Sequence, residues 1–201
     1  MRIIILTLIT ILLVSCGNDS AKEKERAFNN QFVQASIEED PVERLEKLES
    51  LMDVGDEYER YVILGRAAKA AFSSKEYEKA DFYSRKLLSI APQYQDDWNY
   101  GNAIHAGHLV LGRIAVKDGD LKKAKEHLLL AGKTPGSPQL NSFGPNMSLA
   151  NDLLEAGEKE AVIEYFKACK KFWEMNDGRL DSWIASIKGG GKPYFGTNLR
   201  Y

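Results

Sequence analysis

The chain of 201 residues is poor in cysteine, with only Cys16 and Cys169. Two cysteines exclude a framework of several disulfides, so the fold has to be held by a hydrophobic core. The hydrophobic content of 44%, with glycine and proline near their usual frequencies, is typical of a globular chain that can bury such a core.

An excess of one charge is also missing. The 27 Lys and Arg residues are nearly balanced by 29 Asp and Glu residues, which leaves a formal net charge of −2. Proteins that bind nucleic acid need a basic surface for the phosphate backbone. We therefore expect no nucleic-acid partner.

Motifs of catalysis and cofactor binding are absent as well. The sequence holds no GxSxG, P-loop, GxGxxG or HExxH motif and no paired CxxC spacing. The run "GGGKPYFG" from Gly189 follows a predicted helix instead of opening one, so it is expected to be a flexible hinge to a C-terminal tail over 189–201. His105 and His108 can share a helix face, but a metal site needs a third or fourth ligand. We expect no enzyme activity, no cofactor and no metal.

Long apolar runs are missing except at the N-terminus, where one extends from Ile3 to Val14. As a helix these residues would span about 18 Å, at ~1.5 Å per residue, against roughly 30 Å for the hydrocarbon core of a bilayer. The run therefore predicts a signal peptide over 1–15. An uncleaved anchor, or a secretory signal that is cleaved at another small residue, is the alternative.

The end of this run, Leu13-Val14-Ser15-Cys16, resembles the lipobox of bacterial lipoproteins. The resemblance implies that Cys16 carries the lipid, that 16–25 is a tether, and that the protein is attached to a membrane of the bacterial cell envelope. Gly17 stands where an Asp often signals retention in the inner membrane. In a Gram-negative cell we therefore expect the outer membrane, on its periplasmic side. Lipidation would leave Cys169 as the only thiol, with no intrachain disulfide.

The mature chain has helical periodicity and no convincing alternation of apolar and polar residues, so we predict an all-α fold of about eight or nine helices within 26–188. Asp40 and Pro41 are suited to the cap and first position of one helix. The expected helices lie near 25–37, 41–53, 57–73, 76–90, 95–117, 120–131, 147–156 and 159–174, with a final helix over 180–187.

Two segments look like copies of one unit, namely "YVILGRAAKAAFSSKEYEKADFYSRKLLSIAP" (61–92) and "HLVLGRIAVKDGDLKKAKEHLLLAGKTP" (108–135). Both contain Leu-Gly-Arg, a helix, a polar turn, an Ala in a second helix and a closing Pro. A weaker third copy starts at Asn146 and lacks the Pro. These residues resemble the tetratricopeptide repeat, which implies a solenoid of helical hairpins. A plain antiparallel bundle is the alternative.

The resemblance also implies a groove lined by the first helix of each pair, the surface on which tetratricopeptide proteins take protein partners. The Lys and Asn pattern with which some members clamp a terminal carboxylate is not recognisable here. The polar groove candidates of this chain are Arg66, Lys69, Asn102, Arg113 and Lys117.

The stretch "QYQDDWNYGNAIHAGHLVLGR" (93–113) concentrates aromatic and amide side chains. A ring supplies apolar area and an amide fixes orientation, so this composition suits peptide or glycan binding. The alternative is that these rings only pack inside a long helix. The candidate residues of this stretch are Trp98, Asn99, Tyr100, Asn102, His105 and Arg113.

A second candidate segment is the uncharged insert 136–145, which contributes Gln139 and Asn141. We expect Ser137 to cap one helical turn, and Leu140 and Phe143 to be buried against the stack. The insert then has either a structural role or a direct contact with a partner.

Two functional hypotheses follow. The first is a lipid-anchored adaptor that holds an unknown envelope protein in its groove. The alternative is an envelope lipoprotein that binds a peptide or glycan with the aromatic and amide groove around Trp98 to His105. A hydrolase would need acids with perturbed pKa values, for which Asp96 and Asp97 are the nearest candidates. Cys169 is expected to be a small buried hydrophobe.

Overall fold

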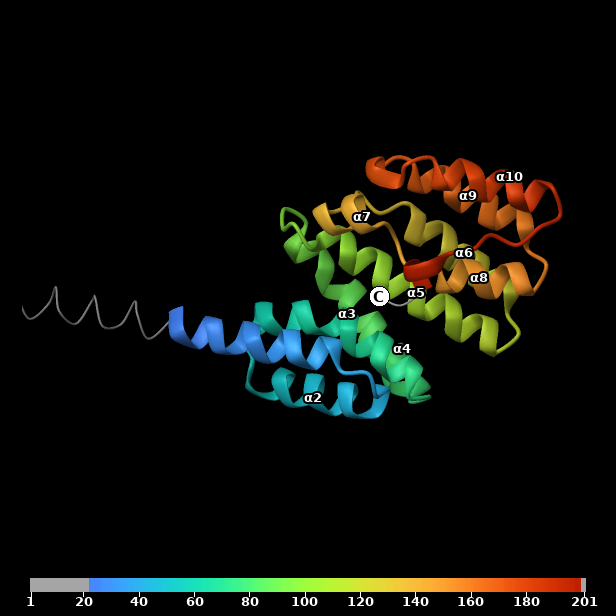
Figure 1. Ribbon diagram of the computed structural model, residues 1–201. Helices are drawn as coiled ribbons and strands as arrows, with labels where there is room; N and C mark the ends of the chain where they lie inside the picture. The colour runs from blue at the N-terminus through green and yellow to red at the C-terminus, as the bar shows by residue number, and fades with distance from the viewer. Residues whose placement is uncertain (1–21, 200–201) are drawn as a thin grey trace, which may run out of the picture.

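The computed structural model describes residues 22–199, and all regular structure in this range is helical (Figure 1). The predicted all-α class is therefore confirmed, with ten α-helices. The predicted signal peptide and the lipidation site Cys16 lie outside the described residues. The helices are 22–37, α2 (Pro41–Val54), α3 (Glu57–Ser73), α4 (Tyr77–Ile90), α5 (Tyr100–Lys117), α6 (Leu121–Gly132), α7 (Pro138–Phe143), α8 (Ser148–Glu155), α9 (Lys159–Cys169) and α10 (Arg179–Lys188). Short 3₁₀ helices cover Ala91–Tyr94 (η1), Glu174–Asn176 (η2) and Gly196–Leu199 (η3).

Several helices begin where the sequence places a capping side chain. Asp40 Oδ1 accepts hydrogen bonds from the backbone N–H groups of Val42 and Glu43, at 2.8 and 3.0 Å. Asp56 and Glu59 form a reciprocal capping box at the start of α3. These side chains satisfy N–H groups that have no partner within the helix, so the helix starts are fixed by local chemistry. The helix 22–37 includes residues 22–25, which were expected to belong to the tether.

Two predicted boundaries are wrong. The helix expected over 95–117 starts only at Tyr100, because the preceding residues form turns. Within them Asp97 N–H donates to Tyr94 O at 3.0 Å, and Asp97 Oδ1 accepts from Asn99 N–H at 2.8 Å. The helix expected over 159–174 ends at Cys169, beyond which the fully buried Trp173 adopts a non-helical backbone, with φ −103° and ψ 72°.

Helices that follow one another in the chain pack together, namely α2 with α3, α3 with α4, α4 with α5, α5 with α6 and α8 with α9. Helices two or three apart in the chain also contact each other, α3 with α5, α5 with α8 and α6 with α9. Figure 1 shows helices 22–37 and α2 at one end, α9 and α10 at the other, and α5 between them. Short connections between antiparallel helices account for the contacts of sequence neighbours, and the tetratricopeptide-like solenoid stays a prediction.

One glycine of the repeat-like pattern has a packing role. A Cβ atom on Gly112 of α5 would lie 2.3 Å from Leu149 Cδ2 of α8 and 3.1 Å from His127 Cβ of α6. The first distance is shorter than real Cβ contacts, so a larger residue at this position would require the Leu149 side chain to move. The hydrophobic core on this side is continuous from α5 to α10 and contains Leu153, Phe166 and Trp173.

The insert 136–145 forms α7. Ser137 Oγ accepts a hydrogen bond from Leu140 N–H at 3.0 Å, and Leu140 is buried, as predicted. The prediction that Phe143 is buried is wrong, because this side chain is 65% exposed. Asn146 Oδ1 accepts from Ser148 N–H at 2.8 Å and so supports the start of α8.

The C-terminal segment does not leave the domain. Phe195 is buried in the core, and Asn198 Nδ2 donates to the carbonyl oxygens of Phe143 and Pro145, each at 3.1 Å. The predicted C-terminal tail therefore packs on the domain through Phe195 and Asn198, and the flexible hinge at the glycine run stays a prediction. No helix within residues 22–199 is long and apolar enough to span a bilayer.

Candidate functional site

A cavity of about 360 Å³ lies between helix 22–37, α3, α5 and α7. Five of the residues predicted from the sequence line it, together with Arg66 and Lys69 of the groove candidates. Those five are Trp98, Asn99, Asn102, His105 and Gln139. The aromatic and amide stretch and the uncharged insert, 37 residues apart at Asn102 and Gln139, therefore belong to one site.

Asn102 connects the walls of this cavity. Its Nδ2 donates to Asn99 Oδ1 at 2.8 Å and to Gln139 Oε1 at 2.6 Å, and its Oδ1 accepts from Ser137 Oγ at 2.7 Å. These bonds join α5 to α7. The amide side chains are thereby held in fixed orientations at the edge of the cavity.

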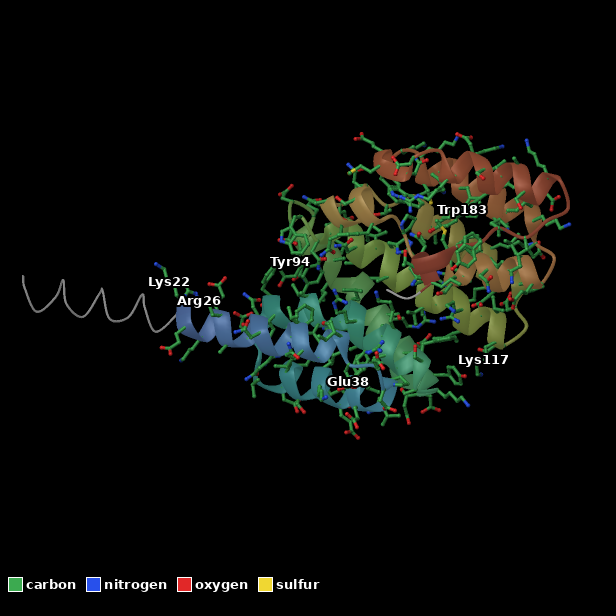
Figure 2. The ribbon with its side chains drawn as sticks, in the orientation of Figure 1. Lys22, Arg26, Glu38, Tyr94, Lys117 and Trp183 are labelled. Atoms are coloured by element: carbon green, nitrogen blue, oxygen red, sulfur yellow. The ribbon has the colours of Figure 1, made fainter. Side chains whose placement is uncertain are left out.

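Aromatic rings form part of the apolar lining, beside aliphatic residues such as Leu87 and Leu109. Trp98, on the turn before α5, lines the cavity and is 51% exposed, so it lies where the cavity meets the surface. Tyr61 is fully buried and stacks on Tyr94, with ring centroids 4.2 Å apart. Figure 2 shows Tyr94 on the segment before α5, at the opposite end of this helix from Lys117. The Tyr61 hydroxyl has no hydrogen-bond partner among the described residues.

His105 forms the floor of the cavity rather than a titrating group. It is buried, and its Nε2 lies 3.0 Å from the hydroxyl of Tyr165 in α9. Burial, and to a lesser degree the charge of Lys69, lowers the pKa of His105 to about 3. The imidazole is therefore neutral at physiological pH.

Arg66 and Lys69 bring positive charge to the α3 wall. Burial lowers the pKa of Lys69 to about 7, with further contributions from the charges of Arg66 and Arg44. Burial also lowers the pKa of Arg66, and its guanidinium carbon lies 5.5 Å from the centre of the Phe32 ring. Neither cation forms an ion pair within residues 22–199.

Three predicted site residues lie elsewhere. Arg113 pairs with Asp152 of α8 at 2.7 Å and lies over the Phe72 ring, so it joins two hairpins. Asn141 Oδ1 accepts from the N–H groups of Glu174 and Met175, which holds the 3₁₀ helix η2. Tyr100 packs into the apolar cluster beside η1 and does not line the cavity. The groove candidate Lys117 pairs with Asp118 at 2.9 Å.

Four lining residues were not predicted as site residues from the sequence, namely Phe32, Tyr61, Phe143 and Asn146. A signal for one of them existed. Tyr61, Gly65 and Lys69 are four residues apart on α3 and therefore share a helix face. No comparable signal places Phe32, since helix 22–37 is brought to the cavity by packing between distant segments.

Other groups of chemical interest do not form a second centre. In the described part of the chain, no cluster of three or more His, Cys, Asp or Glu residues is placed to hold a metal ion. His108 and His127 bond to each other through their Nδ1 atoms at 3.0 Å. Cys169 is fully buried, and burial raises the pKa of its thiol well above the usual range, so it is an inert core residue as predicted.

Comparisons with known proteins add no identity. No protein-family model, no curated protein and no solved structure matches this chain. The function therefore has to be argued from the cavity and its lining.

Proposed function

We propose that this chain is a lipid-anchored protein of the bacterial cell envelope that binds a peptide or glycan fragment in the cavity between α3, α5 and α7. The observation that carries the proposal is the cavity lining. It combines an accessible ring, Trp98, with oriented amides, Asn102 and Gln139, and the volume of about 360 Å³ is within the usual range for small-molecule sites. Rings offer apolar area and amides fix orientation, which is how peptides and sugars are commonly held.

The proposed location rests on the lipobox-like residues Leu13 to Cys16 and on Gly17 after them. In this proposal Cys16 carries the acyl chains and places the cavity at the periplasmic face of the outer membrane. Metabolic labelling with an alkyne fatty acid tests it. We expect label on the full chain and none on Cys16→Ala, and equal labelling of the two would refute the anchor.

Ligand binding can be tested with tryptophan fluorescence, because Trp98 is the only one of the three tryptophans that lines the cavity. The purified full chain is titrated with soluble peptide and glycan fragments of digested cell wall. We expect a saturable change that is absent in Trp98→Phe. A flat titration, confirmed by an unchanged melting temperature at the highest fragment concentration, would reject the proposal.

Gln139→Ala and Gln95→Ala make a matched pair for this titration. Both glutamines are exposed, but only Gln139 lines the cavity and bonds to Asn102. We expect weaker fragment binding for Gln139→Ala and unchanged binding for Gln95→Ala. Equal affinities would place the binding outside the cavity.

A second candidate is the adaptor role, in which a protein partner docks at the same opening. The exposed rings of Trp98 and Phe143, 51% and 65% exposed, favour it because both line the cavity and reach the surface. Crosslinking in intact cells from a photoreactive residue at 143 is expected to trap one partner protein. Recovery of none would reject the adaptor and leave the small-ligand proposal standing.

A further inference from the structure

The two cations of the cavity wall have no counter-ion among the residues that the structure describes. Arg66 and Lys69 are three residues apart on α3 and both line the cavity. Arg113 and Lys79, by contrast, pair with Asp152 and Glu49. Within residues 22–199 no carboxylate lines this cavity, so its charge is positive only.

An uncompensated charge in a partly buried site is unfavourable, because water is removed and no opposite charge replaces it. Arg44 of α2, also a cation, contributes a further charge that disfavours protonation of Lys69. Such a pair is stabilised when an anion enters between the two groups. The cavity therefore has an electrostatic preference that the aromatic and amide residues do not provide.

Resting on the proposed function, we propose that the ligand is an amphiphilic acid whose compact oxyanion, a carboxylate or phosphate, binds Arg66 and Lys69 while its apolar body contacts Trp98 and Phe143. The guanidinium offers a planar pair of donors and the ammonium a point charge, which together suit such an oxyanion. Asn102 and Gln139 then lie beside the ligand body and orient it.

The other groups around Lys69 do not change their protonation near neutral pH. His105 of α5 is neutral, since its pKa is lowered to about 3, and burial raises the pKa of Tyr165 behind it and of Tyr61 on α3. Phe32 of helix 22–37 and Gln139 of α7 carry no charge. Lys69, with its pKa of about 7, is thus the group whose protonation changes near neutral pH.

Three probes with the same ring test the proposal on the purified full chain: benzoate, phenyl phosphate and neutral benzamide. Calorimetric titration is expected to give at least tenfold tighter binding for one of the anions than for benzamide. The better of the two anions identifies the source of the oxyanion as carboxylate or phosphate. Binding of that anion is expected to weaken as the pH rises from 6 to 8.5, because Lys69 loses its proton.

Lys69→Met and Arg66→Met are each expected to weaken binding of that anion by tenfold or more, and Lys69→Met also removes its pH dependence. Lys86→Met, the same change at an exposed position outside the cavity, is the matched control and leaves binding unchanged. Melting curves of all variants verify that they fold.

Two outcomes overturn the anion site. If benzamide binds as tightly as both anions, the cavity has no charge preference. If neither anion binds at concentrations up to about 50 mM, which is above the millimolar dissociation constants of weak ligands, the cavity has no oxyanion site. Neither result touches the proposed function if cell-wall fragments still give the saturable Trp98 signal. Loss of that signal is what separates failure of the proposed function from failure of this inference.

Discussion

At the scale of single residues, the site depends on side chains whose surroundings differ from those the sequence indicates. His105 lies in a stretch rich in aromatic and amide residues, which suggested a role in ligand binding. The side chain is nevertheless buried against Tyr165 and stays neutral. Lys69 has the look of an ordinary surface lysine on a charged chain, yet its pKa is lowered to about 7. Burial is the main cause of both pKa shifts, and it is set by helices distant in sequence.

Lys69→Met is expected to raise the free energy of unfolding at pH 7 by about 1–2 kcal/mol, the usual gain when a strained functional group is removed. The folded pKa of Lys69 is about 7 and the ordinary value is 10.5, so between these pH values the unfolded chain binds a proton that the folded chain lacks. Stability of the natural chain therefore rises with pH across this window. Urea unfolding at pH 7 and pH 9.5 measures the effect.

The advantage of Lys69→Met is expected to shrink at the higher pH, because the natural lysine is then destabilising to a smaller degree. Lys86→Met is the control and is expected to change stability by less than about 0.5 kcal/mol at either pH. A variant that is less stable than the natural chain at pH 7 would contradict the uncompensated charge.

At the scale of elements, helix existence could be predicted from the sequence and helix ends could be predicted only in part. Asp40 and Asp56 have capping side chains, and α2 and α3 begin beside them. The predicted start of α5 and the predicted end of α9 were wrong. A turn at Asp97 precedes α5, and the chain leaves the helical conformation after α9 at the buried Trp173. Apolar periodicity indicates which side of a segment is buried. It does not reveal a turn after which the same side of the chain stays buried.

The attachment of α7 to α5 can be tested at Asn102. Asn102→Leu keeps the size of the side chain but removes its bonds to Asn99, Gln139 and Ser137. We expect the free energy of unfolding to fall by about 1–3 kcal/mol, because the polar partners of Asn102 are left without hydrogen bonds. Hydrogen exchange of residues 138–143 is expected to become faster, because α7 opens more often.

Asn30→Leu, at an exposed position of helix 22–37, is the control for this change and is expected to leave the exchange of α7 unaltered. Unchanged exchange of residues 138–143 in Asn102→Leu would mean that burial of Leu140, and not the amide network, holds α7 in place.

At the scale of the whole molecule, the sequence predicted the all-α class and the order of the helices more readily than the site between them. The order of helices and the pairing of α3 with α4, α5 with α6 and α8 with α9 follow from local signals and short turns. The cavity requires helix 22–37, α3, α5 and α7 to meet, and only long-range packing brings them together. Trp98 and Gln139 were therefore predicted as two separate candidates, and the sequence did not predict that they line the same cavity.

The packing of the C-terminal segment against the hydrophobic core leads to the last prediction. Phe195 is buried, with its ring centroid 5.0 Å from that of Trp183 and 6.0 Å from that of Phe166, while the neighbouring Tyr194 is 88% exposed. Phe195→Ala leaves a cavity in this core and is expected to lower the free energy of unfolding by about 3 kcal/mol. Tyr194→Ala is expected to change it by less than about 0.5 kcal/mol. Urea unfolding followed by circular dichroism measures both, and equal effects of the two changes would show that the C-terminal segment is not part of the core.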